Sequence, residues 1–278
     1  MRVSLIYATW PVTPFGVTWY KLAESLRAAG LTQALIEAGH QVEEHPLTAT
    51  GPAATELRGG FELSARIAAQ CRAAAESGAF PVIISGSCGV AAAGAVAGLG
   101  GARTGIFWMD AHPDLNTPET SGSGLFDGMA LATALGQCWE HMVRTAGLET
   151  GHAENVRLFG ARDIDPGEAD FIARHGIPRG TEVPLDLSRL SACEKVYVHL
   201  DMDVHDALTV RTNNFAVPNG PSVEEVRAAL VEIARATPLA ALSVTGLDPA
   251  APDGERAMAL AIEHVRAVCD GLSASEVA

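Results

Sequence analysis

The sequence is short of positive charge and has no long apolar run. Its 278 residues carry 19 Lys and Arg against 33 Asp and Glu, which gives a net charge of −14 without any basic cluster. Nucleic-acid recognition needs clustered positive charge, so this composition argues against a nucleic-acid partner. No apolar run approaches the roughly 18–20 residues that cross a bilayer, and no charged-then-apolar leader opens the chain. We expect a soluble, cytoplasmic protein with no membrane partner.

Paired cysteines are also lacking. The chain has five cysteines, an odd number, widely spaced and without a CxxC pair. This usage fits a reducing compartment better than a disulfide framework. Four of them are interpreted as small buried hydrophobic residues, and Cys88 alone is given a chemical role.

What the sequence does have is an alternation of short apolar runs with longer Ala-rich amphipathic stretches, and 48% hydrophobic residues exclude a mostly disordered chain. The apolar runs predict strands at Val3–Ala8, Gln41–Glu44, Pro81–Ser85, Thr104–Met109, Val156–Gly160, Lys195–Leu200 and Leu239–Val244. The amphipathic stretches predict helices at Tyr20–Ala38, Glu62–Ser77, Gly128–Leu135, Gly167–His175, Val223–Ala236 and Gly254–Cys269. This pattern predicts one α/β domain over residues 1–278, with a parallel sheet covered by helices on each side.

Three residues with metal-ligating side chains come shortly after predicted strands. They are Cys88, Asp110 and Asp201. Open parallel sheets bind ligands beyond the carboxyl ends of their strands. We therefore expect these three side chains at the same edge of the sheet.

Two acidic motifs extend this set: DAHPD from Asp110 to Asp114, and DMD from Asp201 to Asp203. Together they supply four carboxylates and the imidazole of His112. Crowded carboxylates are strongly unfavourable without cations, and two divalent ions would balance four of them. Such ligands suit Mn²⁺, with Fe²⁺, Co²⁺ and Zn²⁺ left open. A lone DxD is common in loops and helix caps, but both motifs in this order are much more specific.

The order of glycine-rich strand end, DAHxD and DxD resembles the arginase–agmatinase (ureohydrolase) superfamily over nearly the whole chain. The resemblance implies a three-layer α/β/α sandwich with a central, mainly parallel sheet and a bridged pair of Mn²⁺ ions. It implies that Asp110, Asp114 and Asp201 bind one ion, and that Asp110, His112, Asp201 and Asp203 bind the other. The family's reaction is metal-assisted hydrolysis of a guanidino group, in which activated water attacks the guanidino carbon. Asp114 is also predicted to be catalytic.

Three further residues match the arginase branch of the family. Asn116 and Ser123 fall where arginases hold the substrate's α-carboxylate, and Asp165 falls where they hold the α-amino group. An amide and a hydroxyl that donate to a carboxylate, with an acid opposite an ammonium group, form a clamp for a small-molecule amino-acid substrate. Interpreted as structure alone, Asn116 and Ser123 would be turn formers and Asp165 a helix start.

Three positions depart from the arginase pattern. Cys88 stands where the family has a histidine ligand; a thiolate there would make its metal a weaker Lewis acid, and a buried thiol off the site is the alternative. Asp127 replaces the proton-shuttling histidine. It is a weak candidate for that catalytic role, since nearby cations lower the pKa of a carboxyl, and a helix N-cap before Gly128 is favoured. Gly246 stands where a glutamate faces the guanidinium.

The clamp is thus kept and the guanidino end altered, which indicates an arginine analogue with a less basic or larger distal group. The combination resembles the branch that hydrolyses Nω-hydroxy-L-arginine to L-ornithine and hydroxyurea in D-cycloserine biosynthesis, which predicts a manganese-dependent amidinohydrolase. The alternatives are an arginase or other guanidino-acid hydrolase, a non-catalytic metal-holding protein, and an enzyme with Cys88 as nucleophile. The oligomeric state is left open.

The other histidines are assigned no ligand role. His199 alternates into the predicted sheet and is interpreted as structural, while His205 is left open as a replacement for the missing proton shuttle. The rest are expected to be solvated: His40, His45, His141, His152, His175 and His264.

Overall fold

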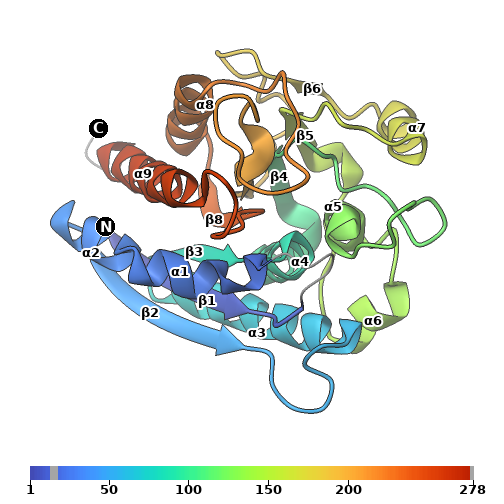
Figure 1. Ribbon diagram of the computed structural model, residues 1–278, viewed down its shortest axis with the longest axis horizontal. Helices are drawn as coiled ribbons and strands as arrows, with labels where there is room; N and C mark the ends of the chain where they lie inside the picture. The colour runs from blue at the N-terminus through green and yellow to red at the C-terminus, as the bar shows by residue number, and fades with distance from the viewer. Residues whose placement is uncertain (13–17, 276–278) are drawn as a thin grey trace.

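The computed structural model describes residues 1–12 and 18–275 (Figure 1). The strands of this part of the chain are β1 (Arg2–Thr9), β2 (Gln41–Thr48), β3 (Ala79–Ser85), β4 (Thr104–Met109), β5 (Val156–Phe159), β6 (Arg179–Gly180), β7 (Lys195–Asp201) and β8 (Leu239–Thr245). Its α-helices are α1 (Leu22–Ala28), α2 (Leu31–Glu37), α3 (Leu57–Glu76), α4 (Cys88–Leu99), α5 (Ala130–Ala134), α6 (Glu140–Thr145), α7 (Pro166–His175), α8 (Val223–Ala236) and α9 (Gly254–Ser275). None of the helices described is both long and apolar enough to span a membrane.

All eight strands form one sheet in the order β2-β1-β3-β8-β7-β4-β5-β6, and every neighbouring pair is parallel. All seven predicted strands are present. The strand that was missed, β6, has only two residues, too few to show any periodicity.

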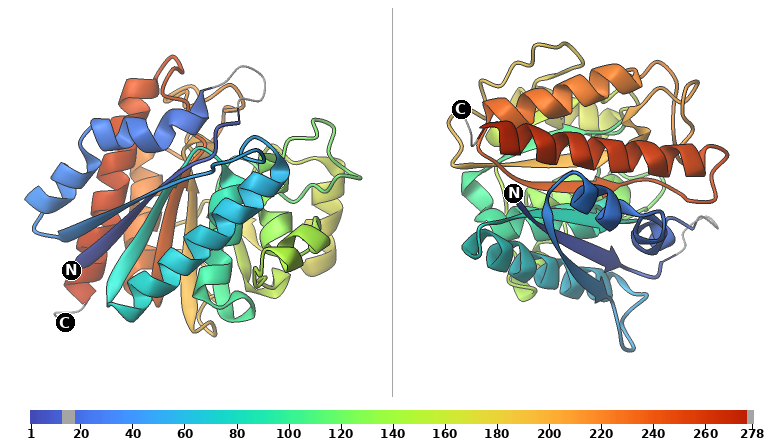
Figure 2. Two further views of the ribbon diagram at one scale, coloured as in Figure 1. Left: turned by 90° about the horizontal axis from the view of Figure 1, so that it is seen from below. Right: turned by 90° about the vertical axis from the view of Figure 1, so that its left-hand side faces the viewer.

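Helices cover both faces of the sheet, as the left view of Figure 2 shows. The buried side chains of α1, α2, α8 and α9 belong to the core on one face, and those of α3 to α7 belong to the core on the other. The predicted three-layer α/β/α sandwich with a parallel central sheet is therefore confirmed.

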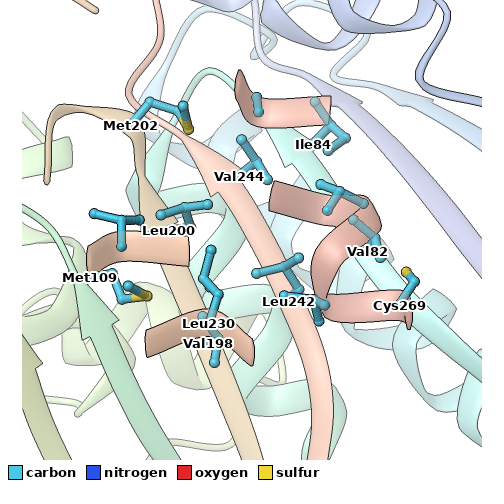
Figure 3. Close-up of a cluster of buried hydrophobic side chains, with 14 of the residues drawn as sticks. Val82, Ile84, Met109, Val198, Leu200, Met202, Leu230, Leu242, Val244 and Cys269 are labelled. Atoms are coloured by element: carbon cyan, nitrogen blue, oxygen red, sulfur yellow. The ribbon is translucent and has the colours of Figure 1, made fainter. Parts of the chain in front are cut away.

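The core between the sheet and the C-terminal helices is closely packed and apolar (Figure 3). Val82, Leu242 and Val198 from three adjacent strands lie with Leu230 of α8 and Cys269 of α9, and all five are fully buried. Burying one such aliphatic side chain contributes about 1.5–3 kcal/mol. Strands buried on both faces explain the continuous apolar runs of the sequence.

Helix α4 was not predicted. All of its residues are buried, so its sequence, CGVAAAGAVAGL, has no polar face and no amphipathic period. Its glycines allow close contact with α3: a Cβ on Gly94 would lie 2.7 Å from Ile67, and one on Gly98 would lie 2.6 Å from Cys71. A helix of small residues that is buried on all sides therefore shows no hydrophobic period in the sequence by which it could be predicted.

The single helix predicted over Tyr20–Ala38 is wrong in one respect. Gly30 adopts a left-handed backbone, with φ of 92°, and divides the segment into α1 and α2. The other predicted helices are present: α8 has the predicted ends, and α3, α5, α7 and α9 have shifted ends. Three of the four cysteines expected to be buried are so, and Cys193 is half-buried.

Candidate metal centre

The carboxyl ends of four adjacent strands open into one pocket. β3, β8, β7 and β4 are neighbours in the sheet, and Cys88, Gly246, Asp201 and Asp110 lie at or just beyond their ends. The cavity has a volume of about 220 Å³. His205, left open as a proton shuttle, is buried and not among the lining residues. Every predicted ligand and clamp residue lines the cavity, as does Asp127: Cys88, Asp110, His112, Asp114, Asn116, Ser123, Asp127, Asp165, Asp201 and Asp203. The structure thus brings these side chains together at one edge of the sheet, while their roles stay predictions.

Asp110, His112 and Asp203 form one group that could hold a metal ion. The His112 Nδ1 atom lies 3.3 Å from Asp110 Oδ1 and 3.4 Å from Asp203 Oδ2. Backbone N–H groups orient both carboxylates: that of His112 donates to Asp110 Oδ1 at 2.7 Å, and that of Ala111 donates to Asp203 Oδ1 at 3.2 Å. The indole N–H of Trp108 donates to the other Asp110 oxygen at 3.2 Å. These partners fix the directions of the potential ligand atoms.

Cys88, His199 and Asp201 form a second group that could hold a metal ion. Cys88 begins helix α4, and its Sγ donates to Asp201 Oδ2 at 3.1 Å. His199 is fully buried, as predicted; its ring stacks on Trp108 with centroids 3.7 Å apart, and its Nδ1 lies 3.0 Å from the Tyr197 hydroxyl. Its place near a thiol and a carboxylate was missed, although residues two apart on a strand share a face, as His199 and Asp201 do.

Asp114 has a left-handed backbone, with φ of 51°. This conformation is rare in residues other than glycine and costs roughly 1–2 kcal/mol. The side chain is buried, and the Asp114 carbonyl accepts the N–H of Ala132 at 3.0 Å. The backbone strain is therefore held in place by the packing around an acidic pocket residue, a pattern that clusters at functional sites.

Burial and mutual repulsion shift the pKa values of these acids. Burial, and after it the charge of Asp203, raise the pKa of Asp110 to about 7. Burial also raises the pKa of three neighbours, with a further rise from nearby carboxylates. They are Asp114, Asp201 and the Cys88 thiol. Burial would raise the pKa of Asp203 too, but the charge of His112 outweighs it and lowers the pKa.

The donor set fits a pair of divalent cations. It offers four carboxylates, an imidazole and a thiol in one buried pocket, with too little positive charge from the protein to neutralise the acids. Oxygen ligands with one or two softer donors suit Mn²⁺ and the other first-row divalent metals. The residues therefore fit the group that the family resemblance implies, without fixing which metal is bound.

The predicted clamp residues lie at another part of the pocket, two of them in direct contact. Asn116 Nδ2 donates to Asp165 Oδ2 at 2.9 Å, and Asn116 Oδ1 accepts from the Thr120 hydroxyl at 2.9 Å. Asp165 is also the N-cap residue of α7, so the helix-start interpretation holds as well. Ser123 is exposed, and its Oγ accepts the N–H of Leu125 at 3.2 Å. An amide, a hydroxyl and a carboxylate thus face one space.

Glu168 is a pocket residue that the sequence analysis missed. It is buried, and its two oxygens accept the N–H groups of Leu115 and Asp165, each at 2.9 Å. It therefore ties the loop after DAHPD to the start of α7. The available signal was the capping-box spacing between Asp165 and Glu168.

Asp127 caps a helix, but a different one from the helix expected. Its carboxylate accepts the Ser87 hydroxyl at 2.5 Å and the Gly89 N–H at 3.2 Å, which places it at the N-terminus of α4, and it makes no cap for the turn that begins at Gly128. An anion at a helix N-terminus is stabilised by the unpaired N–H groups and the helix dipole. Burial still raises the pKa of Asp127 above its ordinary value.

Gly246 has no room for a side chain. Its φ is 62°, and a Cβ would lie 1.8 Å from Asp201 Oδ1. Asn213 lies beside it: Nδ2 donates to the Gly246 carbonyl at 2.6 Å and to Asp203 Oδ2 at 3.1 Å. The aromatic rings of Trp19 and Phe215 line the same pocket. Asn213 and Phe215 come from a loop and Trp19 begins a short 3₁₀ helix, and none of the three carries a sequence signal for a site.

Two histidines expected to be solvated are buried, so that prediction is wrong for them. His264 of α9 places Nε2 3.0 Å from Nε2 of His205, and His40 places Nε2 3.1 Å from Asp270 Oδ1. The position of a histidine on a helix does not tell which face the tertiary fold covers. His141, His152 and His175 are exposed, as predicted.

A parallel α/β/α sandwich with a ligand-rich pocket over its central strands defines the class, and comparison with known proteins identifies the family. The Arginase family model matches residues 21–269, so the chain belongs to this family. It is 38% identical over 138 residues to the arginase of Bacillus subtilis and 32% identical over 191 residues to that of Brevibacillus brevis. These matches cover 45% and 62% of this chain, and 46% and 63% of the two relatives, less than two thirds of their lengths.

Solved arginases share the fold over most of the chain. The crystal structure of Bacillus subtilis arginase superimposes with a TM-score of 0.85 at 26% identity, over 96% of this chain and 98% of that one. Entamoeba histolytica arginase in complex with L-ornithine gives a TM-score of 0.83 at 20% identity, over 98% and 97% of the two chains. The second likeness speaks for the fold alone.

Proposed function

We propose that the protein is a binuclear-metal amidinohydrolase that converts Nω-hydroxy-L-arginine and water into L-ornithine and hydroxyurea, as an enzyme of antibiotic biosynthesis of the D-cycloserine type. The observation that carries the proposal is the contrast between the two ends of the pocket. The clamp residues Asn116, Ser123 and Asp165 line one part of it, whereas at the guanidino end Gly246 adds no carboxylate to those of the candidate metal ligands.

The clamp residues would orient the substrate. Asn116 and Ser123 would donate to the α-carboxylate of the substrate, and Asp165 would accept from its α-ammonium group. The contact between Asn116 and Asp165 holds the two polar groups at a fixed spacing before any substrate arrives. Preorganised partners of this kind reduce the entropy cost of binding.

The metal ions would be held by the six ligand-capable residues of the pocket, with Mn²⁺ as the proposed metal. They are Cys88, Asp110, His112, Asp114, Asp201 and Asp203. When bound, such a pair supplies Lewis acidity that activates water near neutral pH for attack on the guanidino carbon. Replacement of an imidazole by the Cys88 thiolate would add negative charge and make the metal it binds a weaker Lewis acid.

Proton transfer is assigned to Asp114 and Asp127. Both line the pocket, Asp114 buried and Asp127 half-buried, and burial raises the pKa of Asp127 above its ordinary value. A carboxyl with a raised pKa can pass a proton to the departing amine of ornithine near neutral pH. The Ser87 hydroxyl and the Gly89 N–H fix the position of the Asp127 carboxylate.

Arginine hydrolysis is the second candidate, favoured by the arginases among the relatives. The test is ornithine release by Mn²⁺-loaded protein from each substrate at matched concentration, with and without a chelator. We expect release from Nω-hydroxy-L-arginine to exceed release from L-arginine by at least tenfold, and chelation to abolish both. Equal release would make the protein an arginase, and no release from either substrate would favour the non-catalytic alternative.

A further inference from the structure

Two aromatic side chains face the altered end of the pocket. Trp19 and Phe215 both line the cavity that holds the candidate metal ligands, and their rings stack with centroids 5.8 Å apart and planes at 28°. Trp19 is buried and Phe215 is half-buried. We call this pair the aromatic wall.

Separate hydrogen bonds attach each half of the wall to the segment after β8. The N–H and the hydroxyl of Thr18 donate to the Asp248 carboxylate at 3.0 and 2.6 Å, which anchors the chain next to Trp19. On the other side, Asn213 Oδ1 accepts the N–H of Phe215 at 2.7 Å. Because Asn213 also donates to the Gly246 carbonyl, both loops are fixed around Gly246 and Asp248.

The two glycines beside the aromatic wall, Gly86 and Gly246, leave no space for a side chain. A Cβ on Gly86, at the end of β3, would lie 2.1 Å from the Trp19 carbonyl oxygen, so this loop lies directly on the strand end. A Cβ on Gly246 would meet the side-chain carboxylate of Asp201, and the φ of 62° at Gly246 disfavours any side chain there. Neither strand end can present a side chain here, which leaves the two rings as the surface on that side.

Sheet order separates the wall from the clamp. Asp165 follows β5 and Gly246 follows β8, and strands β7 and β4, which carry most of the candidate ligands, lie between them. A substrate with its amino-acid end at the clamp would extend across the ligands toward the wall. The wall therefore lies where the distal group of the substrate is expected.

We propose that Trp19 and Phe215 determine specificity by binding the distal group of the substrate through an aromatic surface in place of a carboxylate. This inference rests on the proposed function and deepens it. A planar, weakly basic hydroxyguanidine can stack on such a surface without leaving a buried charge unpaired, and its extra oxygen gains contact area. A guanidinium stays charged at all ordinary pH values and would have a cation–π contact with the rings in place of a carboxylate dedicated to it.

The first test removes one ring and compares it with a matched change elsewhere. Phe215→Leu is measured beside Phe171→Leu, a half-buried aromatic of α7 outside the pocket, on Nω-hydroxy-L-arginine and on L-arginine. We expect Phe215→Leu to lower kcat/KM for the hydroxylated substrate roughly tenfold, mainly through KM. L-arginine should change less than threefold, and Phe171→Leu should change neither substrate.

Two more variants guard against loss of folding. Trp19→Phe keeps an aromatic ring and should retain most of the preference that Trp19→Leu loses, with circular dichroism and metal content checked for both. Phe215→Glu, on the half-exposed side of the wall, supplies a carboxylate and should shift the preference toward L-arginine.

The outcomes separate the two proposals. A wild-type protein without preference for the hydroxylated substrate overturns the proposed function and this inference with it. A wild-type protein with the preference, kept unchanged in folded Phe215→Leu and Trp19→Leu variants, overturns the wall alone. Loss of the preference in both, with Phe171→Leu unaffected, supports the wall.

Discussion

At the scale of single residues, the proposed specificity of the pocket rests on Gly246. Its left-handed backbone and its contact with Asp201 follow from the path of the chain after β8, so the position is closed to any side chain. The absence of a glutamate is therefore built into the local fold, beyond the identity of one residue.

We expect Gly246→Glu to lose function on both substrates and to gain none on L-arginine. The new Cβ would displace Asp201, and the left-handed backbone adds roughly 1–2 kcal/mol of strain. Bound Mn²⁺ per chain and urea unfolding check this, with Gly246→Ala as the smaller step in the same direction. A stable Gly246→Glu protein that hydrolyses L-arginine would contradict the account of this position.

Arg162 is a second residue on which the pocket depends, without lining it. Its guanidinium donates to the backbone carbonyls of Gly160, Asp203, Val204, His205, Val217 and Pro218. These carbonyls belong to the end of β5 and to the loop that follows β7. Arg162 thus holds the DMD motif and its loop in one conformation.

For Arg162→Lys we expect a loss of about 2–4 kcal/mol of unfolding free energy. The ammonium group of lysine has three N–H donors at one point, so it cannot donate to all six carbonyls as the wider guanidinium does. Metal affinity should fall with it, since Asp203 lies in this loop. Urea unfolding and metal titration measure the two effects, and exposed Arg144→Lys on α6 is the matched control. Wild-type stability in Arg162→Lys would show that the loop is held by other contacts.

At the scale of elements, the sequence predicts helices and strands whose apolar residues follow a regular pattern, and it misses those without one. Strands buried on both faces give continuous apolar runs, and amphipathic helices such as α8 show a clear period, so these were found. Helix α4 was missed because a helix of small residues buried all round has no period. The ligand motifs were predictable because they directly follow strands, whereas Trp19, Asn213 and Phe215 reach the pocket only through the tertiary path of their loops.

Helix α9 contributes a titratable contact to the core. The His205 Nδ1–H donates to the Met202 carbonyl at 2.9 Å, so His205 Nε2 must accept the proton of His264 Nε2. Burial, and after it the neighbouring His205 and Arg227, lower the pKa of His264 to about 3. His264 therefore folds in its neutral form.

This pair predicts a loss of stability in mild acid. A histidine with a pKa near 6.5 in the unfolded chain and about 3 in the folded one stabilises the fold fully above pH 6.5, and the contribution falls as the pH drops toward 3. Between pH 7.5 and pH 5 we expect a loss of about 2 kcal/mol from this group. His264→Gln keeps a donor for His205 and cannot titrate, so its unfolding free energy should depend less steeply on pH. An unchanged pH dependence would contradict the assignment.

At the scale of the whole molecule, strand order creates the site. β3, β8, β7 and β4 are far apart in the chain and adjacent in the sheet, so one edge collects a thiol, an imidazole, four carboxylates and a closed glycine. The protein supplies too little positive charge to balance the buried acids, so bound cations would contribute to the stability of the fold.

Metal removal should therefore destabilise the protein as well as inactivate it. We expect a chelator to lower Tm by several degrees at neutral pH and added Mn²⁺ to restore it. Asp201→Asn should abolish most of the Mn²⁺-dependent rise in Tm. A Tm independent of chelator and metal would argue that the pocket holds no ions.

The central claim is that an amino-acid clamp has been kept while the guanidino end has been altered for a hydroxylated group. The most direct measurement is a competition, in which Mn²⁺-loaded protein receives equal concentrations of Nω-hydroxy-L-arginine and L-arginine, and hydroxyurea and urea are quantified together by mass spectrometry. The product ratio equals the ratio of the two kcat/KM values. We predict at least tenfold more hydroxyurea than urea. Equal amounts, or an excess of urea, would contradict the account.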